Sequence, residues 1–243
     1  MGNIVNLFKI LSLIFLTEII FFGNALADQR SYVWTYEYQT LSKGSWELEY
    51  YNTISANELN HFKGNTTTQH QIELEVGMSE TFDFGIYQIF SQTGEGGIHY
   101  DGFKFRGRYK LSSTGKLFFN PLIYFEYQGV PDFQNHTFEF KLILTKDIGS
   151  FNVALNPYIE FEKEGAGKWE FKPQYALGVS YAISDKLKFG IESKASEDGV
   201  YLGPTLAHGS KDIWVALSPT FSVGKAKSGQ PEFYLRLLLG FGA

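Results

Sequence analysis

Cations occupy every second position in one short stretch of the chain, and carboxylates do the same in three others. From residue 103 to 111, aromatic, small or aliphatic residues alternate with Lys104, Arg106, Arg108 and Lys110. Successive side chains of a strand point to opposite faces, so this stretch has one cationic and one mainly apolar face. Acidic pairs with the same spacing are Glu47 and Glu49, Glu73 and Glu75, and Glu160 and Glu162. The chemistry that these patterns offer is electrostatic.

Patterns typical of catalysis or metal binding are absent from the sequence. No pair of histidines has the spacing of a metal site on one strand face, and the five are His61, His70, His99, His136 and His208. The chain has no cysteine, and no G-x-S-x-G elbow surrounds a serine. We therefore expect no enzymatic activity, no cofactor and no metal; the alternative is a membrane-embedded lipid enzyme.

The elements that position the charges are short alternating segments, which indicate β-strands. We expect twelve, at 32–40, 45–55, 68–78, 82–92, 102–111, 116–128, 136–146, 150–162, 168–182, 186–195, 211–223 and 231–241. Most are long enough for a tilted crossing of a bilayer, whereas strands of soluble proteins average about 5–6 residues. This length favours a membrane protein over a soluble one.

Connections between these segments alternate between tight polar turns and longer polar loops. Turns such as 79–81 and 147–149 contrast with loops such as 57–67 and 129–135. Short turns at one rim and long loops at the other are typical of outer-membrane barrels. The first connection is short where that topology requires a loop, and 200–207 is a candidate thirteenth strand. A repeat, Asn120-Pro121 and Asn156-Pro157, recurs 36 positions on and indicates hairpin duplication.

Residues 1–27 are expected to form a cleaved signal peptide. Lys9 precedes a mostly apolar stretch, and Ala25-Leu26-Ala27 is an A-x-A cleavage site. The apolar stretch is short for a retained membrane anchor, which is the alternative interpretation. Residues 28–243 would then be one exported domain without disulfides. Its 23 Phe and 15 Tyr suit a lipid-facing surface, and the net charge of −5 offers no broad basic face for nucleic acid.

The two faces of the strands have different expected environments. Toward lipid we place Tyr32, Trp34, Tyr36, Tyr38, Ile72, Leu74, Val76, Phe82, Phe84, Ile86, Phe233, Leu235, Leu237, Leu239 and Phe241. Toward the lumen we place Glu47, Glu49, Glu73, Glu75, Lys104, Arg106, Arg108, Lys110, Glu160 and Glu162. The alternative is a soluble β-sandwich or lipocalin-like barrel with its apolar side chains inside. Pro121, Pro157, Pro173 and Pro219 share the apolar parity, and we expect bulges or rim positions there.

The closing segment, Glu232 to Phe241, resembles the insertion signal of Gram-negative outer-membrane β-barrel proteins. With the signal peptide and the alternating strands, the resemblance covers residues 28–243. Gly242 and Ala243 follow Phe241, where this class usually ends on an aromatic residue. The resemblance implies an outer-membrane location, with the lipid bilayer as partner.

The sequence thus predicts an all-β protein, a single antiparallel transmembrane barrel of about twelve strands. The predicted function is a porin-like passive channel for small polar solutes, with Arg106 and Arg108 facing Glu73 and Glu75 as electrostatic selectors. In the alternative, the charges pair and close the lumen, and the barrel is a scaffold or a loop-based binding protein. The oligomeric state and the solute stay open.

Overall fold

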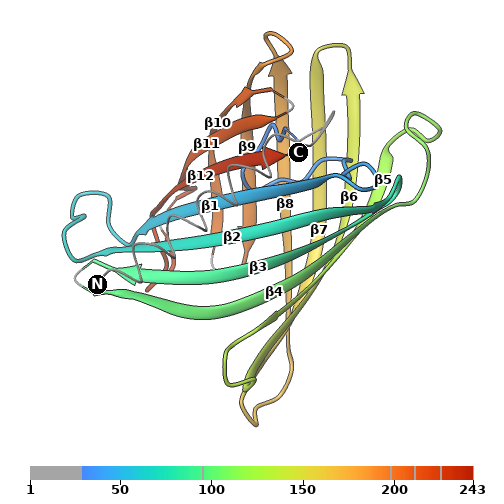
Figure 1. The fold of residues 1–243 in the computed structure, drawn as a ribbon. Coiled ribbons are helices and arrows are strands. Elements are labelled where there is room, and N and C mark those ends of the chain that lie inside the picture. The colour runs from blue at the N-terminus through green and yellow to red at the C-terminus, as the bar shows by residue number, and fades with distance from the viewer. Residues whose placement is uncertain (1–28, 95, 198, 211, 225, 243) are drawn as a thin grey trace, which may run out of the picture.

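The protein is a closed antiparallel β-barrel in a computed structural model that describes residues 29–94, 96–197, 199–210, 212–224 and 226–242 (Figure 1). The predicted signal peptide lies outside the described residues. Each strand pairs with its neighbours in sequence, and β12 closes the barrel against β1. The strands are β1 (Trp46–Ala56), β2 (Thr66–Ser79), β3 (Phe82–Thr93), β4 (Ile98–Lys110), β5 (Asn120–Gly129), β6 (Asn135–Ile148), β7 (Phe151–Glu164), β8 (Glu170–Ala182), β9 (Leu187–Ser196), β10 (Gly199–Gly209), β11 (Ile213–Ser222) and β12 (Phe233–Gly242).

The all-β fold and the strand number are confirmed, but two strand assignments exchange places. Residues 32–40 form no strand, and the stretch left as an optional thirteenth strand is β10. The alternating pattern of residues 32–40 wrongly predicted a strand, because a segment that runs inside the barrel also places its side chains on two sides. In β10 the neighbouring Gly203 and Pro204 weakened a strand pattern that is otherwise regular.

This exchange removes the mismatch in loop lengths. The first connection is now the long loop 57–65, which lies at the same rim as 130–134 and 226–232. We call this the loop rim. The opposite rim, the turn rim, holds the two-residue turns 80–81 and 149–150 and one longer connection, 111–119. Both β1 and β12 reach this rim, with Trp46 and Gly242.

The outer wall of the barrel is apolar over most strands. Ile72 and Leu74 are exposed, as are Phe140, Phe189 and Leu239. The inward positions alternate with them, as the burial of β2 and β10 shows. In the described part of the chain, no helix is long and apolar enough to cross a membrane.

The lipid-facing prediction is wrong for the four aromatic residues of 32–38. Tyr32, Tyr36 and Tyr38 are buried and Trp34 is partly buried, because residues 29–41 run inside the barrel. We call residues 29–41 the inserted segment. Its dark-blue trace passes behind β1 in Figure 1. Gly178 of β8 makes room for it, since a Cβ there would lie 2.5 Å from the Tyr32 ring.

Three of the five strand prolines, Pro157, Pro204 and Pro219, lie at two gaps in the hydrogen-bond ladder. Pairing of β6 with β7 is absent between Lys141 and Leu144, opposite Pro157, and pairing of β10 with β11 is absent around Pro219. The register is the same on both sides of each gap, so these are ladder gaps and not the expected bulges. A missing proline N–H explains each gap.

Candidate functional site

Five charged side chains of β2, β3 and β4 form a buried ion-pair cluster inside the barrel. Arg106 Nη2 lies 2.7 Å from Glu73 Oε1 and 2.6 Å from Glu75 Oε2. Arg108 Nη2 lies 2.7 Å from Asp83 Oδ2 and also contacts Glu75. All five are at most 3% exposed. Charges this deeply buried are tolerated because each has an opposite partner.

The strand register brings the members of this cluster together. Glu75 of β2 pairs with Gly85 of β3, which pairs in turn with Arg106 of β4. A side chain at position 85 would overlap Glu73 and Arg106. Asp83 pairs directly with Arg108. The glycine thus leaves the space in which the guanidinium of Arg106 reaches across β3 to β2.

The carboxylates predicted on β1 are also buried and bonded. Glu47 accepts a hydrogen bond from Trp214 Nε1 at 2.5 Å. Glu49 accepts one from Tyr51, whose hydroxyl is also 2.8 Å from Glu73. Glu49, Glu73 and Glu75 are close enough to share a cation. Arg106 already supplies positive charge to two of them, and we assign no metal to this cluster.

The remaining predicted lumen residues lie nearer the rims. Lys104 Nζ is 2.9 Å from Glu126 Oε1. Glu160 accepts a hydrogen bond from Gln174, and Glu162 pairs with Lys172 at 2.5 Å. Toward the turn rim, Lys110 lies over the ring of Tyr38. The ten predicted residues therefore fall into a buried cluster and several separate contacts. Their role as selectors stays a prediction.

The inserted segment enters the lumen from the turn rim, forms a closed loop and returns. Gln29 bonds to the main chain of Lys186 in the turn between β8 and β9. The base of the loop is closed by Glu37, whose carboxylate accepts hydrogen bonds from Ser31 N at 2.6 Å and Ser31 Oγ at 2.7 Å. Arg30 Nη2 donates to the Thr35 carbonyl at 3.4 Å. The loop thus holds its own shape.

Side chains of the barrel wall satisfy the main chain of this loop. The Glu192 carboxylate of β9 accepts from the amides of Val33, Trp34 and Thr35 at 3.2, 2.9 and 3.2 Å. Asn156 of β7 accepts from the amide of Tyr36 at 2.6 Å and donates to its carbonyl at 3.0 Å. Buried main-chain groups need such partners, and here side chains replace a strand ladder.

Aromatic side chains fix the loop between opposite walls. Burial raises the pKa of the Tyr32 hydroxyl above its usual range, so it stays protonated and donates to the Asn152 carbonyl at 2.9 Å. The Trp34 ring lies 3.8 Å from Lys194 Nζ and 4.2 Å from the guanidinium carbon of Arg236. Such cation–π contacts contribute about 0.5–2 kcal/mol each.

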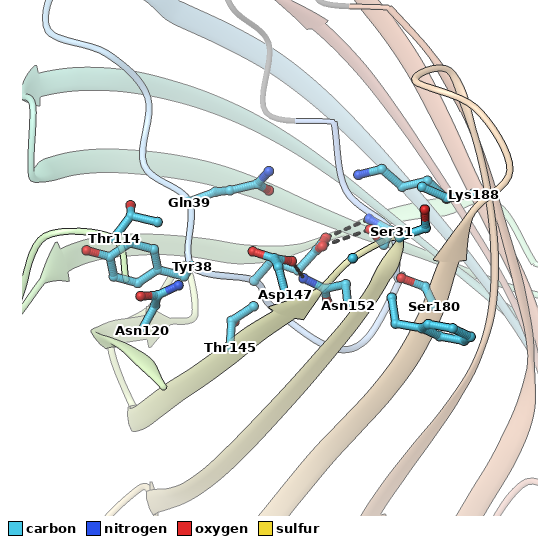
Figure 2. A pocket seen from close by; sticks show the side chains of 15 residues that line it. Ser31, Tyr38, Gln39, Thr114, Asn120, Thr145, Asp147, Asn152, Ser180 and Lys188 are labelled. Atoms are coloured by element: carbon cyan, nitrogen blue, oxygen red, sulfur yellow. Dashed lines mark hydrogen bonds between the residues drawn. The ribbon is translucent and has the colours of Figure 1, made fainter. Parts of the chain in front are cut away.

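Two polar cavities flank the inserted segment. The turn-rim vestibule, about 250 Å³, is lined by Ser31, Tyr38 and Gln39 of the segment and by Asn152 and Lys188 of the wall (Figure 2). The loop-rim vestibule, about 240 Å³, has Val33, Trp34 and Tyr36 on one side. Its other lining residues include Lys104, Tyr124, Glu126, Glu139, Lys141, Tyr158, Glu160, Gln174, Lys194, Tyr201 and Arg236. The lumen is therefore two polar chambers with the inserted segment between them.

Replacing Glu192 with Gln should loosen the inserted segment. The amide side chain has one acceptor oxygen and no charge, so it cannot accept from three amides as the carboxylate does, and bonds to a charged group are worth about 1.5–3 kcal/mol. Amide hydrogen exchange at Val33, Trp34 and Thr35 should become about tenfold faster or more. The matched control is Glu162→Gln at the loop rim. Unchanged exchange in Glu192→Gln would refute the anchoring role.

Comparisons with known proteins identify the fold of the chain but do not assign it to a family. No family model and no curated protein matches the chain. Among solved structures, the COG4313 outer membrane channel from Pseudomonas putida F1 superposes with a TM-score of 0.57 at 12% identity, over 87% of this chain and 100% of that one. The chain has the fold of outer-membrane porins and channels. The KdgM porin in complex with disordered oligogalacturonate gives 0.55 at 11% identity, over 81% and 97%, and the NanC porin 0.55 at 9%, over 80% and 98%.

Sequence reasoning missed the wall residues that hold the inserted segment. Glu192 shares one face of β9 with Lys188 and Lys194, and this alternating stretch was not among those expected to line the lumen. Asn156 lies in the repeated Asn-Pro pair, and both Asn120 and Asn156 face inward and are buried. Asn120 accepts a hydrogen bond from the Gly115 amide. The repeated Asn-Pro pair therefore marked inward, buried asparagines that form hydrogen bonds, whereas from the sequence alone we interpret the pair only as evidence of hairpin duplication.

Proposed function

We propose that the chain is an outer-membrane barrel that passes small polar solutes, with the inserted segment closing the lumen at rest. The observation that carries this proposal is a closed barrel with an apolar outer wall around a charged, hydrogen-bonding interior. Such a wall suits lipid, and a polar chamber at each end of the lumen suits water and polar solutes. The shared fold of the porins and channels named above supports the location in an outer membrane.

The candidate selecting groups are those that line the loop-rim vestibule. Lys104 and Glu160 of the predicted set lie there. Arg106 and Arg108 are at most 3% exposed and bound to carboxylates, so in this arrangement they hold the β2–β4 wall together. We therefore propose that selectivity resides in the vestibule and that the buried cluster stabilises the barrel.

A closed barrel that serves as a scaffold or binding protein is the second candidate. The observation that favours it is the inserted segment, whose Val33 and Thr35 are at most 1% exposed. The two functions differ in whether the segment ever leaves the lumen. Reconstitution in planar bilayers separates them: the channel proposal expects discrete conductance steps, and a silent bilayer together with correct insertion supports the scaffold. Recovery of the protein without detergent would contradict both.

Reversing the charge of Lys104 should shift the ion selectivity of the channel toward cations. Lys104→Glu removes a positive charge beside Glu126 and adds a fourth carboxylate to the three of the vestibule, Glu126, Glu139 and Glu160. Local potential of this kind biases which ion enters, and we expect the cation-to-anion permeability ratio to rise roughly twofold. The matched control is Lys116→Glu, on the exposed connection between β4 and β5. Equal reversal potentials for Lys104→Glu and the unmodified protein would exclude Lys104 from the path.

A further inference from the structure

Arg236 of β12 carries a charge that no acidic residue in the described chain neutralises by an ion pair. Arg106 and Arg108 each bind carboxylates. The guanidinium of Arg236 instead contacts ring faces, 4.2 Å from the centroid of Trp34 and 5.2 Å from that of Tyr51. Its Nε is buried without a hydrogen-bond partner. A half-buried guanidinium of this kind is costly unless an anion joins it.

None of the described side chains accepts a hydrogen bond from the in-plane N–H groups of Arg236. A guanidinium stacks on an aromatic ring through its flat face, whereas it binds a carboxylate through N–H groups in its plane. Trp34 and Tyr51 contact Arg236 as ring partners. The rings therefore hold the guanidinium in a fixed orientation while its in-plane donors remain for a ligand.

The chamber beside Arg236 has the walls of a site for a small polar solute. Arg236 lines the loop-rim vestibule, and Lys194 lies on the same indole ring of Trp34. Across the lumen, two further lysines are already neutralised, with Lys104 paired to Glu126 and Lys141 paired to Glu139. The positive charge left for a ligand among the described residues of this chamber is thus that of Arg236, beside Trp34. Tyrosine rings and the polar ends of glutamate and glutamine surround the rest of the space.

We propose that Arg236, supported by Trp34, binds the carboxylate or a similar oxyanion of a small polar solute in the loop-rim vestibule. The proposal rests on the proposed function, because it names the class of solute that this chamber admits. A cavity of about 240 Å³ limits the occupant to one small molecule. Donors and acceptors on the opposite wall would bind hydroxyl groups of the solute, whereas a purely aromatic acid would leave these wall groups without partners.

Binding here also bears on the inserted segment. Arg236 contacts the segment through the ring of Trp34. A carboxylate that binds the guanidinium neutralises its charge and weakens its attraction to the ring. The solute would thereby loosen one of the contacts that hold the segment in the lumen.

The test is calorimetric titration of the detergent-solubilised full chain with sodium glucuronate and, separately, with glucose. These probes share a ring and differ in one carboxylate. We expect glucuronate to bind and glucose to bind at least about tenfold more weakly, because the charged hydrogen bonds to Arg236 are lost. Arg236→Gln should weaken glucuronate binding about tenfold or more. The affinity of Arg236→Lys should lie between those of the unmodified protein and Arg236→Gln, because lysine keeps the charge and lacks the paired N–H donors of the guanidinium.

Lys188→Gln in the turn-rim vestibule is the matched control and should leave the affinity within about twofold, because that cavity lies on the other side of the segment. Circular dichroism checks that each variant is folded. If Arg236→Gln does not fold, the lower affinity of Arg236→Lys for glucuronate serves as the test. Equal binding of both probes, equal affinity in all Arg236 variants, or loss in Lys188→Gln overturns the site. Titration in detergent requires no conduction, so failure of the channel proposal and failure of this site give different results.

Discussion

Deletion of residues 29–41 should raise the single-channel conductance on the order of tenfold, because the segment fills the middle of a barrel wide enough for a pore. The segment precedes β1 and contributes no strand to the ladder. Its contacts with the wall are made by side chains such as Glu192 and Asn156, which water can hydrate once the segment is gone. The barrel should therefore remain folded while its lumen opens.

A matched deletion distinguishes lumen opening from general loosening of the barrel. Removing residues 59–63 from the loop 57–65 shortens an exposed connection at the loop rim and leaves the inserted segment in place. Conductance should then change little. If deletion of 29–41 leaves the conductance of the folded barrel unchanged, the segment does not close the lumen.

Replacing Arg106 with Met should destabilise the barrel by about 3–5 kcal/mol, since it leaves buried carboxylates without their cation. Arg106 contacts Glu73 and Glu75 at 2.7 and 2.6 Å, and both glutamates are 0% exposed. The methionine fills similar volume, so the loss is electrostatic rather than steric. Reversible urea unfolding from lipid vesicles, followed by tryptophan fluorescence, measures it.

Two further variants locate the cause of that loss. Lys172→Met removes a half-buried cation near the loop rim and should cost at most about 1 kcal/mol, because its partners Glu162, Glu170 and Glu197 are exposed enough to stay hydrated. Combining Arg106→Met with Glu73→Gln and Glu75→Gln should recover part of the stability, since no unpaired charge remains. A loss below about 1 kcal/mol for Arg106→Met would show that the cluster is hydrated and open to solvent.

Most of the barrel could be predicted because alternation with period two is what a strand between two environments requires. The part of β2 around Ile72 and Leu74 follows this rule, with buried and outward positions alternating over residues 71–78. The same rule failed for Tyr32 to Tyr38. Alternation does not distinguish a wall strand, which has lipid on one side, from a segment inside the lumen, which contacts the barrel on both sides. It also did not identify β10 as one of the twelve strands, because Gly203 and Pro204 interrupt the pattern. Gly203 is needed there because a Cβ would clash with the main chain of Pro219 and Thr220.

The sequence predicted which charged residues of the candidate site face inward, but it did not predict which of them form ion pairs. Glu73, Glu75, Arg106 and Arg108 were expected on inward faces from their parity alone. Whether they would line water or bind one another depended on the register between β2, β3 and β4 and on Gly85, which parity does not reveal. Arg236 escaped notice because it is the single charge of β12, and Glu192 because the charged face of β9 was overlooked. Both contact Trp34, which lies more than 150 positions away in the sequence.

Labelling of single cysteines tests the central claim most directly, because the chain has none of its own. The variants are Ser196→Cys in the loop-rim vestibule, Ser150→Cys in the turn-rim vestibule and Thr35→Cys in the inserted segment. With a membrane-impermeant maleimide on intact cells, the structure predicts that position 196 reacts, that position 150 reacts only after the outer membrane is opened, and that position 35 reacts from neither side. Reaction of positions 196 and 150 from the same side, or rapid reaction of position 35, would contradict a membrane-spanning barrel closed by its own inserted segment.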